Sequence, residues 1–172
     1  ETALLLHGKT LLMASSSTSQ VQRFKVLQDL LAEMAVVANT PGEHVSTAVG
    51  EAKPMPSEAT LAALAALLPD SVIQQALHIV DTCGISCVRS EQGRCMYKVK
   101  GKKLTHVVVG HGLYCSCPYF CRRVLEAGEL CCKHWLAVQI ARNLKVGIHS
   151  VSVLNENDFA TWTQEHLVVS PM

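Results

Sequence analysis

Two cysteine-rich stretches decide the fold: Leu113-Tyr-Cys-Ser-Cys-Pro-Tyr-Phe120 and Leu130-Cys-Cys-Lys-His-Trp-Leu-Ala-Val138. The first holds a Cys-x-Cys pair and the second a Cys-x-His pair, with fourteen residues between the two pairs. Three thiolates and one imidazole are ligands that zinc takes in closed, tetrahedral structural sites. The pattern therefore predicts one structural Zn²⁺ ion with four ligands: Cys115, Cys117, Cys132 and His134.

The chain has eight cysteines in all, and reduced thiols are the better interpretation. Disulfide scaffolds are usually shorter and richer in cysteine, and no convincing secretory signal is present. Cys131 is an alternative ligand to its neighbour Cys132, but Cys132 preserves the Cys-x-His pair. A second metal site that includes His106 or His111 is a weaker alternative. The other cysteines are expected to pack as small apolar side chains: Cys83, Cys87, Cys95, Cys121 and Cys131.

Length and composition predict one folded domain, alone or with a flexible arm. The chain has 172 residues, of which 49% are hydrophobic and 17% charged, and its net charge is +1. Wholesale disorder is therefore disfavoured. The best apolar stretch, residues 59–68, ends at Pro69 and falls well short of the roughly 20 residues that a membrane helix needs. We expect no contact with a membrane.

The N-terminal third indicates helices. Apolar residues recur at intervals of three and four over residues 21–38, which predicts an amphipathic helix, and residues 39–56 have the composition of a flexible connector. Ser57 is a candidate N-cap for a helix that ends before Pro69, and a capping-box spacing at Ser71 predicts a second helix that Gly84 ends. Residues 1–56 are accordingly interpreted as an N-terminal arm.

The pattern changes to a period of two at Ile85, over residues 85–89, 96–100 and 104–109, which predicts a short antiparallel β-meander. Two helices should follow, one from Pro118 to Ala127 and one over residues 130–144. The predicted class is α+β: N-terminal helices, a small antiparallel sheet, a zinc knuckle and C-terminal helices. The helical pair and zinc domain would span 57–145, with the zinc motif at 104–142. The remainder, 146–172, would be a C-terminal tail with a possible short helix capped by Asn155.

Basic residues concentrate in the middle of the chain. Residues 94–145 hold ten Lys and Arg against two acidic residues, a balance of +8. Such a block attracts phosphates or an acidic partner when it forms one surface, and the alternative is an ordinary solvated face. The candidate contacts for single-stranded DNA or an acidic partner are Lys98, Lys100, Lys102, Lys103, Arg122 and Arg123.

Enzyme chemistry is not indicated. Four protein ligands leave no open position for a catalytic water, no Cys-x-x-Cys redox motif begins a helix, and Gly110-His-Gly112 lacks the features of a phosphate-binding loop. Apolar faces at 61–68 and 73–80 suggest instead an adaptor with a groove for a partner, against the alternative of ordinary core burial.

The two cysteine-rich stretches resemble the SWIM zinc finger, Cys-x-Cys followed by Cys-x-His. Residues 64–145 more narrowly resemble the SWIM domain-containing protein 7 family, the Shu-complex SWIM-domain subunit, with Cys131 departing from the expected apolar residue. The resemblance implies a nuclear protein that partners a RecA-like recombinase paralogue and supports recombinase filaments in homologous-recombination repair of DNA double-strand breaks. SWIM motifs also occur in transposase-derived and ubiquitin-ligase-like proteins, so a module that binds DNA, chromatin or other proteins directly remains the alternative.

Overall fold

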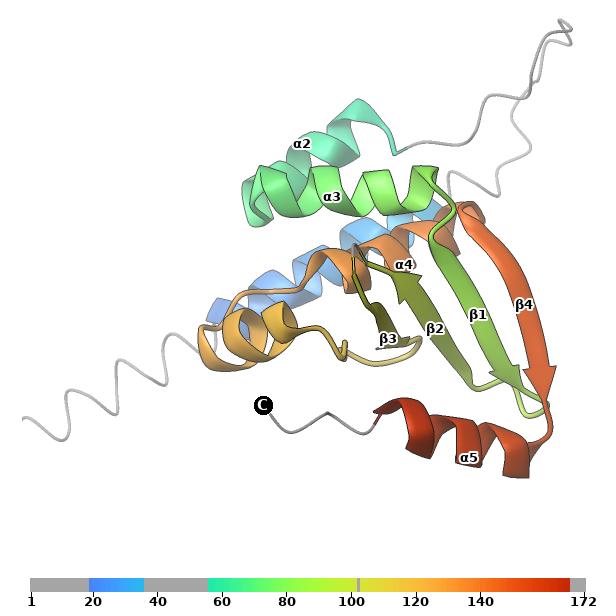
Figure 1. Cartoon of the computed structure of the whole chain (residues 1–172). Helices are drawn as coiled ribbons and strands as arrows, with labels where there is room; N and C mark the ends of the chain where they lie inside the picture. The colour runs from blue at the N-terminus through green and yellow to red at the C-terminus, as the bar shows by residue number, and fades with distance from the viewer. Residues whose placement is uncertain (1–18, 36–55, 102, 168–172) are drawn as a thin grey trace, which may run out of the picture.

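The computed structural model describes residues 19–35, 56–101 and 103–167 (Figure 1). A helix over residues 19–35 comes first. The elements that follow are α2 (Glu58–Leu67), α3 (Asp70–Asp81), β1 (Ile85–Ser90), β2 (Cys95–Lys100), β3 (Thr105–Val109), η1 (Phe120–Glu126), α4 (Lys133–Leu144), β4 (Ile148–Leu154) and α5 (Glu156–Leu167). The α+β class predicted from the sequence is confirmed.

A four-stranded sheet with the order β3-β2-β1-β4 lies at the centre of the fold. The predicted meander is present, because β1 pairs with β2 and β2 with β3, both antiparallel. The fourth strand was not predicted. β4 returns beside β1 in parallel, with Cys87 opposite Val151 and Ser90 opposite Leu154. The sheet is therefore mixed rather than wholly antiparallel, and residues 148–154 belong to it.

Helix α4 is the centre of the core. Its residues Leu136, Ala137, Val138, Ile140 and Ala141 have no exposed surface, and it packs against α3 and against β2 and β3. The helix over residues 19–35 covers another side of α4, where the Asn143 side-chain amide donates to the Leu31 carbonyl at 2.6 Å. On the opposite face of the sheet, α5 closes a small cluster of four buried residues: Val88, Met96, Val107 and Phe159.

The boundaries of α2 and α3 follow local chemistry, with two differences from expectation. Ser57 caps α2 as predicted, accepting a hydrogen bond from the Thr60 amide at 3.1 Å. The predicted cap at Ser71 is wrong: the N-cap is Pro69, two residues earlier, and its fixed φ and missing N–H suit the start of a helix. The left-handed residue that ends α3 is Cys83, with φ of 50°, rather than Gly84.

The helix expected after Pro118 is present, but it is a π-helix over most of its length. The helix expected from Leu130 begins instead at Lys133, so Leu130, Cys131 and Cys132 precede it in non-helical backbone. The short helix expected after Asn155 is α5, and Asn155 accepts a hydrogen bond from the Asp158 amide at 2.9 Å. The non-helical segment before α4 therefore carries Cys131 and Cys132, and η1 carries Cys121.

The apolar faces of α2 and α3 are in the core and do not form a partner groove. Leu64, Leu68, Ile73, Ala76 and Val80 are all buried in the cluster around α4. The suggestion of an adaptor surface on these faces is therefore wrong, because α4 and the helix over residues 19–35 supply the covering that a zinc knuckle alone would not. The predicted connector at 39–56 falls, except for its last residue, outside the described residues, and so does Lys102.

Candidate metal centre

The Cys-x-Cys pair lies in the loop that follows β3, and the sheet fixes its position. Cys115 forms an isolated antiparallel bridge with Val108 of β3. Ser116 joins the same strand twice: its amide donates to the Val107 carbonyl, and its hydroxyl accepts from the Val107 amide, both at 2.9 Å. Because the residues on either side of Cys115 are hydrogen-bonded to β3, this cysteine and the nearby Cys117 are held at the margin of the sheet. Pro118 then begins the helical turn that leads into η1.

The Cys-x-His pair is positioned by the start of α4. Cys132 is the N-cap of this helix, with φ −99° and ψ 163°, and its Sγ accepts a hydrogen bond from the Trp135 amide at 3.5 Å. His134 lies in the first turn. An extended N-cap followed by helical residues turns both side chains toward the loop that carries Cys115 and Cys117. The Trp135 ring nitrogen anchors this end of α4 by donating to the Gly112 carbonyl at 2.8 Å.

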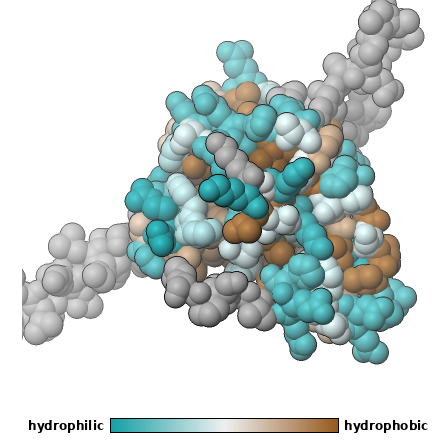
Figure 2. Space-filling view, viewed as in Figure 1, coloured by the Kyte–Doolittle hydropathy of each residue, from teal (hydrophilic) through white to brown (hydrophobic). Residues whose placement is uncertain are grey.

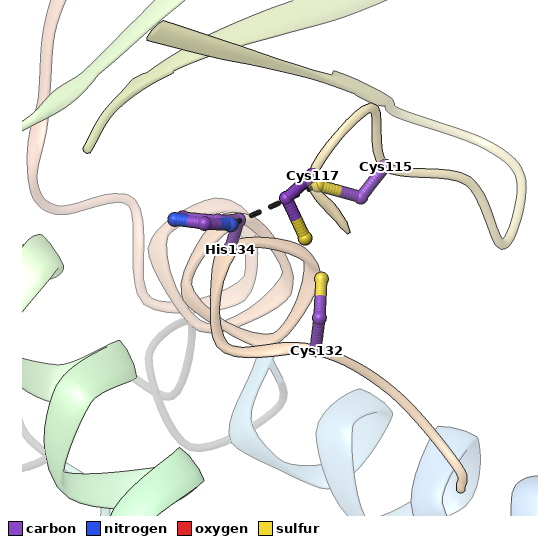
Figure 3. A group of neighbouring side chains, drawn as sticks. All are labelled: Cys115, Cys117, Cys132 and His134. Atoms are coloured by element: carbon purple, nitrogen blue, oxygen red, sulfur yellow. Dashed lines mark hydrogen bonds between the residues drawn. The ribbon is translucent and has the colours of Figure 1, made fainter. Parts of the chain in front are cut away.

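The four side chains converge on one point (Figure 3). The candidate ligand atoms all lie within 4.8 Å of one another, and all four residues are buried. Cys115 Sγ and His134 Nδ1 lie 3.9 Å apart. A tetrahedral zinc with Zn–S bonds of about 2.3 Å holds its ligand atoms about 3.5–3.8 Å apart. The donor set and the spacing therefore fit one metal ion, with small movements of the side chains.

The electrostatics of the group favour loss of a proton from Cys117. A hydrogen bond from Cys115, then one from Cys132, lowers the pKa of the Cys117 thiol, and the Phe120 amide adds a hydrogen bond at 3.3 Å. The same contact with Cys117, then one with Cys132 and then burial, raises the pKa of Cys115. A metal cation could replace the protons that these thiols share in their mutual hydrogen bonds, because thiols bind metals as thiolates.

His106 of β3 completes the surroundings. Its ring lies 4.4 Å from the His134 ring, centroid to centroid. Burial, and then the neighbouring His134, lowers the pKa of His106, so the neutral imidazole is favoured. The sequence singled out His106 only for a different, second metal site. No such second group of His, Cys, Asp or Glu side chains occurs among the described residues.

The other cysteines lie apart from the group. Cys131 is buried, and burial raises the pKa of its thiol. It is Cys132, not Cys131, whose sulfur joins the other three ligand atoms. Cys87 and Cys95 are buried in the sheet, Cys121 is half-buried on η1, and Cys83 is exposed. Ser116 and the Trp135 amide were not recognised from the sequence, although a serine between two ligand cysteines was a visible signal.

The described basic residues that the sequence singled out lie at several places on the fold. Lys98 lies with its ammonium group 5.0 Å from the centre of the Trp162 ring of α5. Arg123 pairs with Glu129, while Arg122 is exposed on η1. Lys103 is exposed after β2. Lys100 and Lys133, by contrast, line a hollow beside His134, and Lys133 donates to Gln75 at 2.6 Å.

No helix among the described residues is long and apolar enough to span a membrane.

No model of a protein family matches the chain, and no solved structure matches it either. Three relatives match and are named zinc finger SWIM domain-containing protein 7. The Homo sapiens protein is 34% identical over 122 residues, 70% of this chain and 78% of the relative. The Mus musculus protein is 33% identical over 70% of this chain and 72% of the relative. The Danio rerio protein is 40% identical over 40% of this chain and 50% of the relative.

The chain has a buried Cys3His group built from a Cys-x-Cys pair and a Cys-x-His pair. It also matches, over 70% of its length, two relatives that are named for the SWIM domain. The chain therefore belongs to the SWIM domain-containing protein 7 family of zinc-finger proteins.

Proposed function

We propose that this chain is a nuclear, non-catalytic zinc-binding subunit that partners a RecA-like recombinase paralogue. In this role it would support recombinase filaments during homologous-recombination repair of DNA double-strand breaks. The proposal is supported by membership of the family and by the resemblance of residues 64–145 to the Shu-complex SWIM-domain subunit.

A structural role for the metal rests on the closed donor set. Catalytic zinc keeps one position open for water or substrate, whereas three sulfurs and one nitrogen here supply a complete tetrahedral shell in a buried place. When bound, zinc would cross-link the loop after β3 to the start of α4, and the chain's own contacts, through Ser116 and Trp135, hold the two halves ready. Metal binding would then contribute directly to the stability of the fold.

The single observation that carries the proposal is where the metal centre sits. Cys132 and His134 lie at the start of α4, and α4 is the helix around which α3, the sheet and the helix over residues 19–35 are packed. Without the metal, the surface that all these elements present to a partner should lose its shape. A partner bound by this subunit should therefore depend on the zinc ligands.

The test is quantitative affinity purification of the full chain from cells, comparing wild type with His134→Ala and identifying the accompanying proteins by mass spectrometry. His111→Ala is the matched control, because His111 is an exposed histidine outside the metal group. We expect a RecA-like ATPase in near-equal amount with wild type and with His111→Ala, and its loss with His134→Ala. Dominance of chromatin, transposase-like or ubiquitin-system proteins would instead refute the recombination role.

A direct contact with single-stranded DNA is the second candidate, favoured by Lys100 and Lys133 beside the hollow at His134 and by exposed Lys103. Phosphate contacts release counterions, so such binding should weaken steeply with salt. Replacing Lys100→Glu together with Lys103→Glu should lower both the affinity and the salt dependence. Binding that is unaffected by salt, or by this double substitution, would exclude phosphate contacts at these lysines.

A further inference from the structure

Strand β4 is an outer edge of the sheet, and it exposes apolar side chains without the charge or proline that usually protects such an edge. It pairs with β1 on one side only, and none of the described strands lies beyond it (Figure 1). Its segment, Ile148-His-Ser-Val-Ser-Val-Leu154, has no Lys, Arg, Asp, Glu or Pro. Val151 and Val153 are 57% and 63% exposed, and Figure 2 shows hydrophobic residues on the side of the molecule where β4 runs. Natural sheets usually protect such an edge with charge, proline or a bulge.

The backbone of β4 determines which residues can pair outward. The Leu154 carbonyl accepts a hydrogen bond from the Glu91 amide at 3.1 Å, so Leu154 faces β1. In a parallel pair, alternate residues direct both their N–H and C=O to the neighbouring strand. Ser150 and Ser152 therefore also face β1, while His149, Val151 and Val153 present theirs to the open edge.

The sequence of β4 is nearly symmetric about Val151. If a second copy of the strand ran antiparallel across a twofold axis at this residue, Val151 would face Val151, Ser150 would face Ser152 and Ile148 would face Leu154. His149 would face Val153. Residues whose backbone groups point outward would thus pair with one another. Three of the four kinds of pair would join side chains of the same type: Val with Val, Ser with Ser, and Ile with Leu. The absence of charge means that no like charges are brought together.

We propose that two copies of this chain associate through β4, joining their sheets across a twofold axis at Val151. The contact is isologous, so it closes and does not propagate into a fibre. The proposal is independent of the function proposed above, since it concerns the far edge of the sheet from β3, which carries the Cys-x-Cys loop. A strand from a different protein on this edge is the rival outcome.

The size of the contact sets the expected affinity. One pair of seven-residue strands buries less than the roughly 1,200 Å² at the lower limit of stable interfaces. The dimer should therefore dissociate on dilution in the micromolar range. Sedimentation of the full, zinc-loaded chain from about 1 to 100 μM should show the mass rising toward twice 18.7 kDa.

The first test replaces the residue on the axis, Val151→Lys, which places two ammonium groups opposite each other. We expect the dissociation constant to rise more than about tenfold with an unchanged melting temperature, because the side chain is exposed. Val26→Lys is the control, an exposed valine on the helix over residues 19–35. A wild type that stays monomeric at 100 μM, or a Val151→Lys variant that dimerises as well as wild type, overturns the proposal.

The second test does not depend on losing an interaction. Directly opposed residues of a hydrogen-bonded antiparallel pair lie about 5.5 Å apart at Cα, a distance that a disulfide spans. In a Cys83→Ser background, which removes the exposed thiol, Val151→Cys should cross-link into a dimer under mild oxidation. Ser150→Cys should not, because its partner would be Ser152. Equal cross-linking of both variants, or of neither, refutes this register; addition of a strand from a recombinase in place of dimerisation would show the rival occupant.

Discussion

The two faces of the sheet differ in how they are covered. On one face, α3, α4 and the helix over residues 19–35 build a core of thirty buried residues, which includes the three candidate ligand cysteines. On the other, α5 alone covers a cluster of four. The first face combines apolar burial with a site for a metal, while the second depends on one buried aromatic ring, Phe159, and on polar contacts at the start of α5. The metal face should therefore determine whether the chain folds, and the α5 face should open locally.

The largest effect is expected on the metal face. Cys117→Ser, or removal of zinc by a chelator, should unfold residues 104–140 and abolish cooperative melting. Structural zinc contributes about 10–16 kcal/mol of apparent binding free energy in small fingers, which is comparable to the whole stability of a domain. Zinc content by mass spectrometry and thermal melting by circular dichroism check this.

Cys121→Ser is the control for that experiment, because Cys121 lies on η1 outside the ligand group. It should keep one equivalent of zinc and the wild-type melting temperature. Zinc content and melting that stay unchanged in Cys117→Ser as well would show that this group does not hold the metal.

A matched pair of truncations should separate the two faces. Ile140→Ala removes a fully buried side chain from α4 and should lower the global free energy of unfolding by about 2–5 kcal/mol. Phe159→Ala should instead release α5, accelerating amide exchange there while exchange in α4 stays slow. Hydrogen exchange resolved by segment distinguishes the outcomes. Equal acceleration in α4 and α5 for Phe159→Ala would mean that the faces unfold as one unit.

Sequence reasoning succeeded where the chemistry is local. Cys115 and Cys117, like Cys132 and His134, are two residues apart, so each half of the site was visible, and the meander followed from its period of two. β4 was missed although Val151 and Val153 alternate after Gly147, because its pairing with β1 spans some sixty residues and leaves its side chains exposed. Nothing in the residues alone distinguished the π-helix η1 from an α-helix.

Gly147 precedes β4 and lies against Val80 of α3, and its substitution should have an intermediate effect. The residue has φ of 72°, and a Cβ there would lie 2.6 Å from the Val80 carbonyl oxygen. Gly147→Ala combines backbone strain with this clash, so a loss of about 1–3 kcal/mol is expected, with faster exchange in β4. Gly93→Ala is the control: it has φ of 86° but open space around it. An equal loss in both variants would attribute the effect to φ alone.

The smallest effect is expected at the start of α5. Glu156 accepts from the Gln92 amide at 2.9 Å and pairs with Arg94. The Gln92 amide, more than Arg94, lowers the pKa of this carboxyl below its ordinary value of 4.5. A lowered folded-state pKa means that the contribution is complete above the ordinary pKa and is lost as pH falls through the folded one. Glu156→Gln should therefore slightly accelerate amide exchange in α5, by a factor that is constant between pH 8 and 6.

The pH dependence is what makes this small effect informative. The difference between Glu156→Gln and wild type should begin to shrink only below about pH 4.5, compared at pH values where the zinc content is unchanged. Glu165→Gln, an exposed carboxyl on the same helix, should leave exchange as in wild type throughout. If the difference already vanished near pH 6, the carboxylate contacts could not be what holds α5, and the helix would depend on the apolar contacts of Phe159, Trp162 and Leu167. Because α5 follows β4 directly, its release would also loosen the open edge of the sheet.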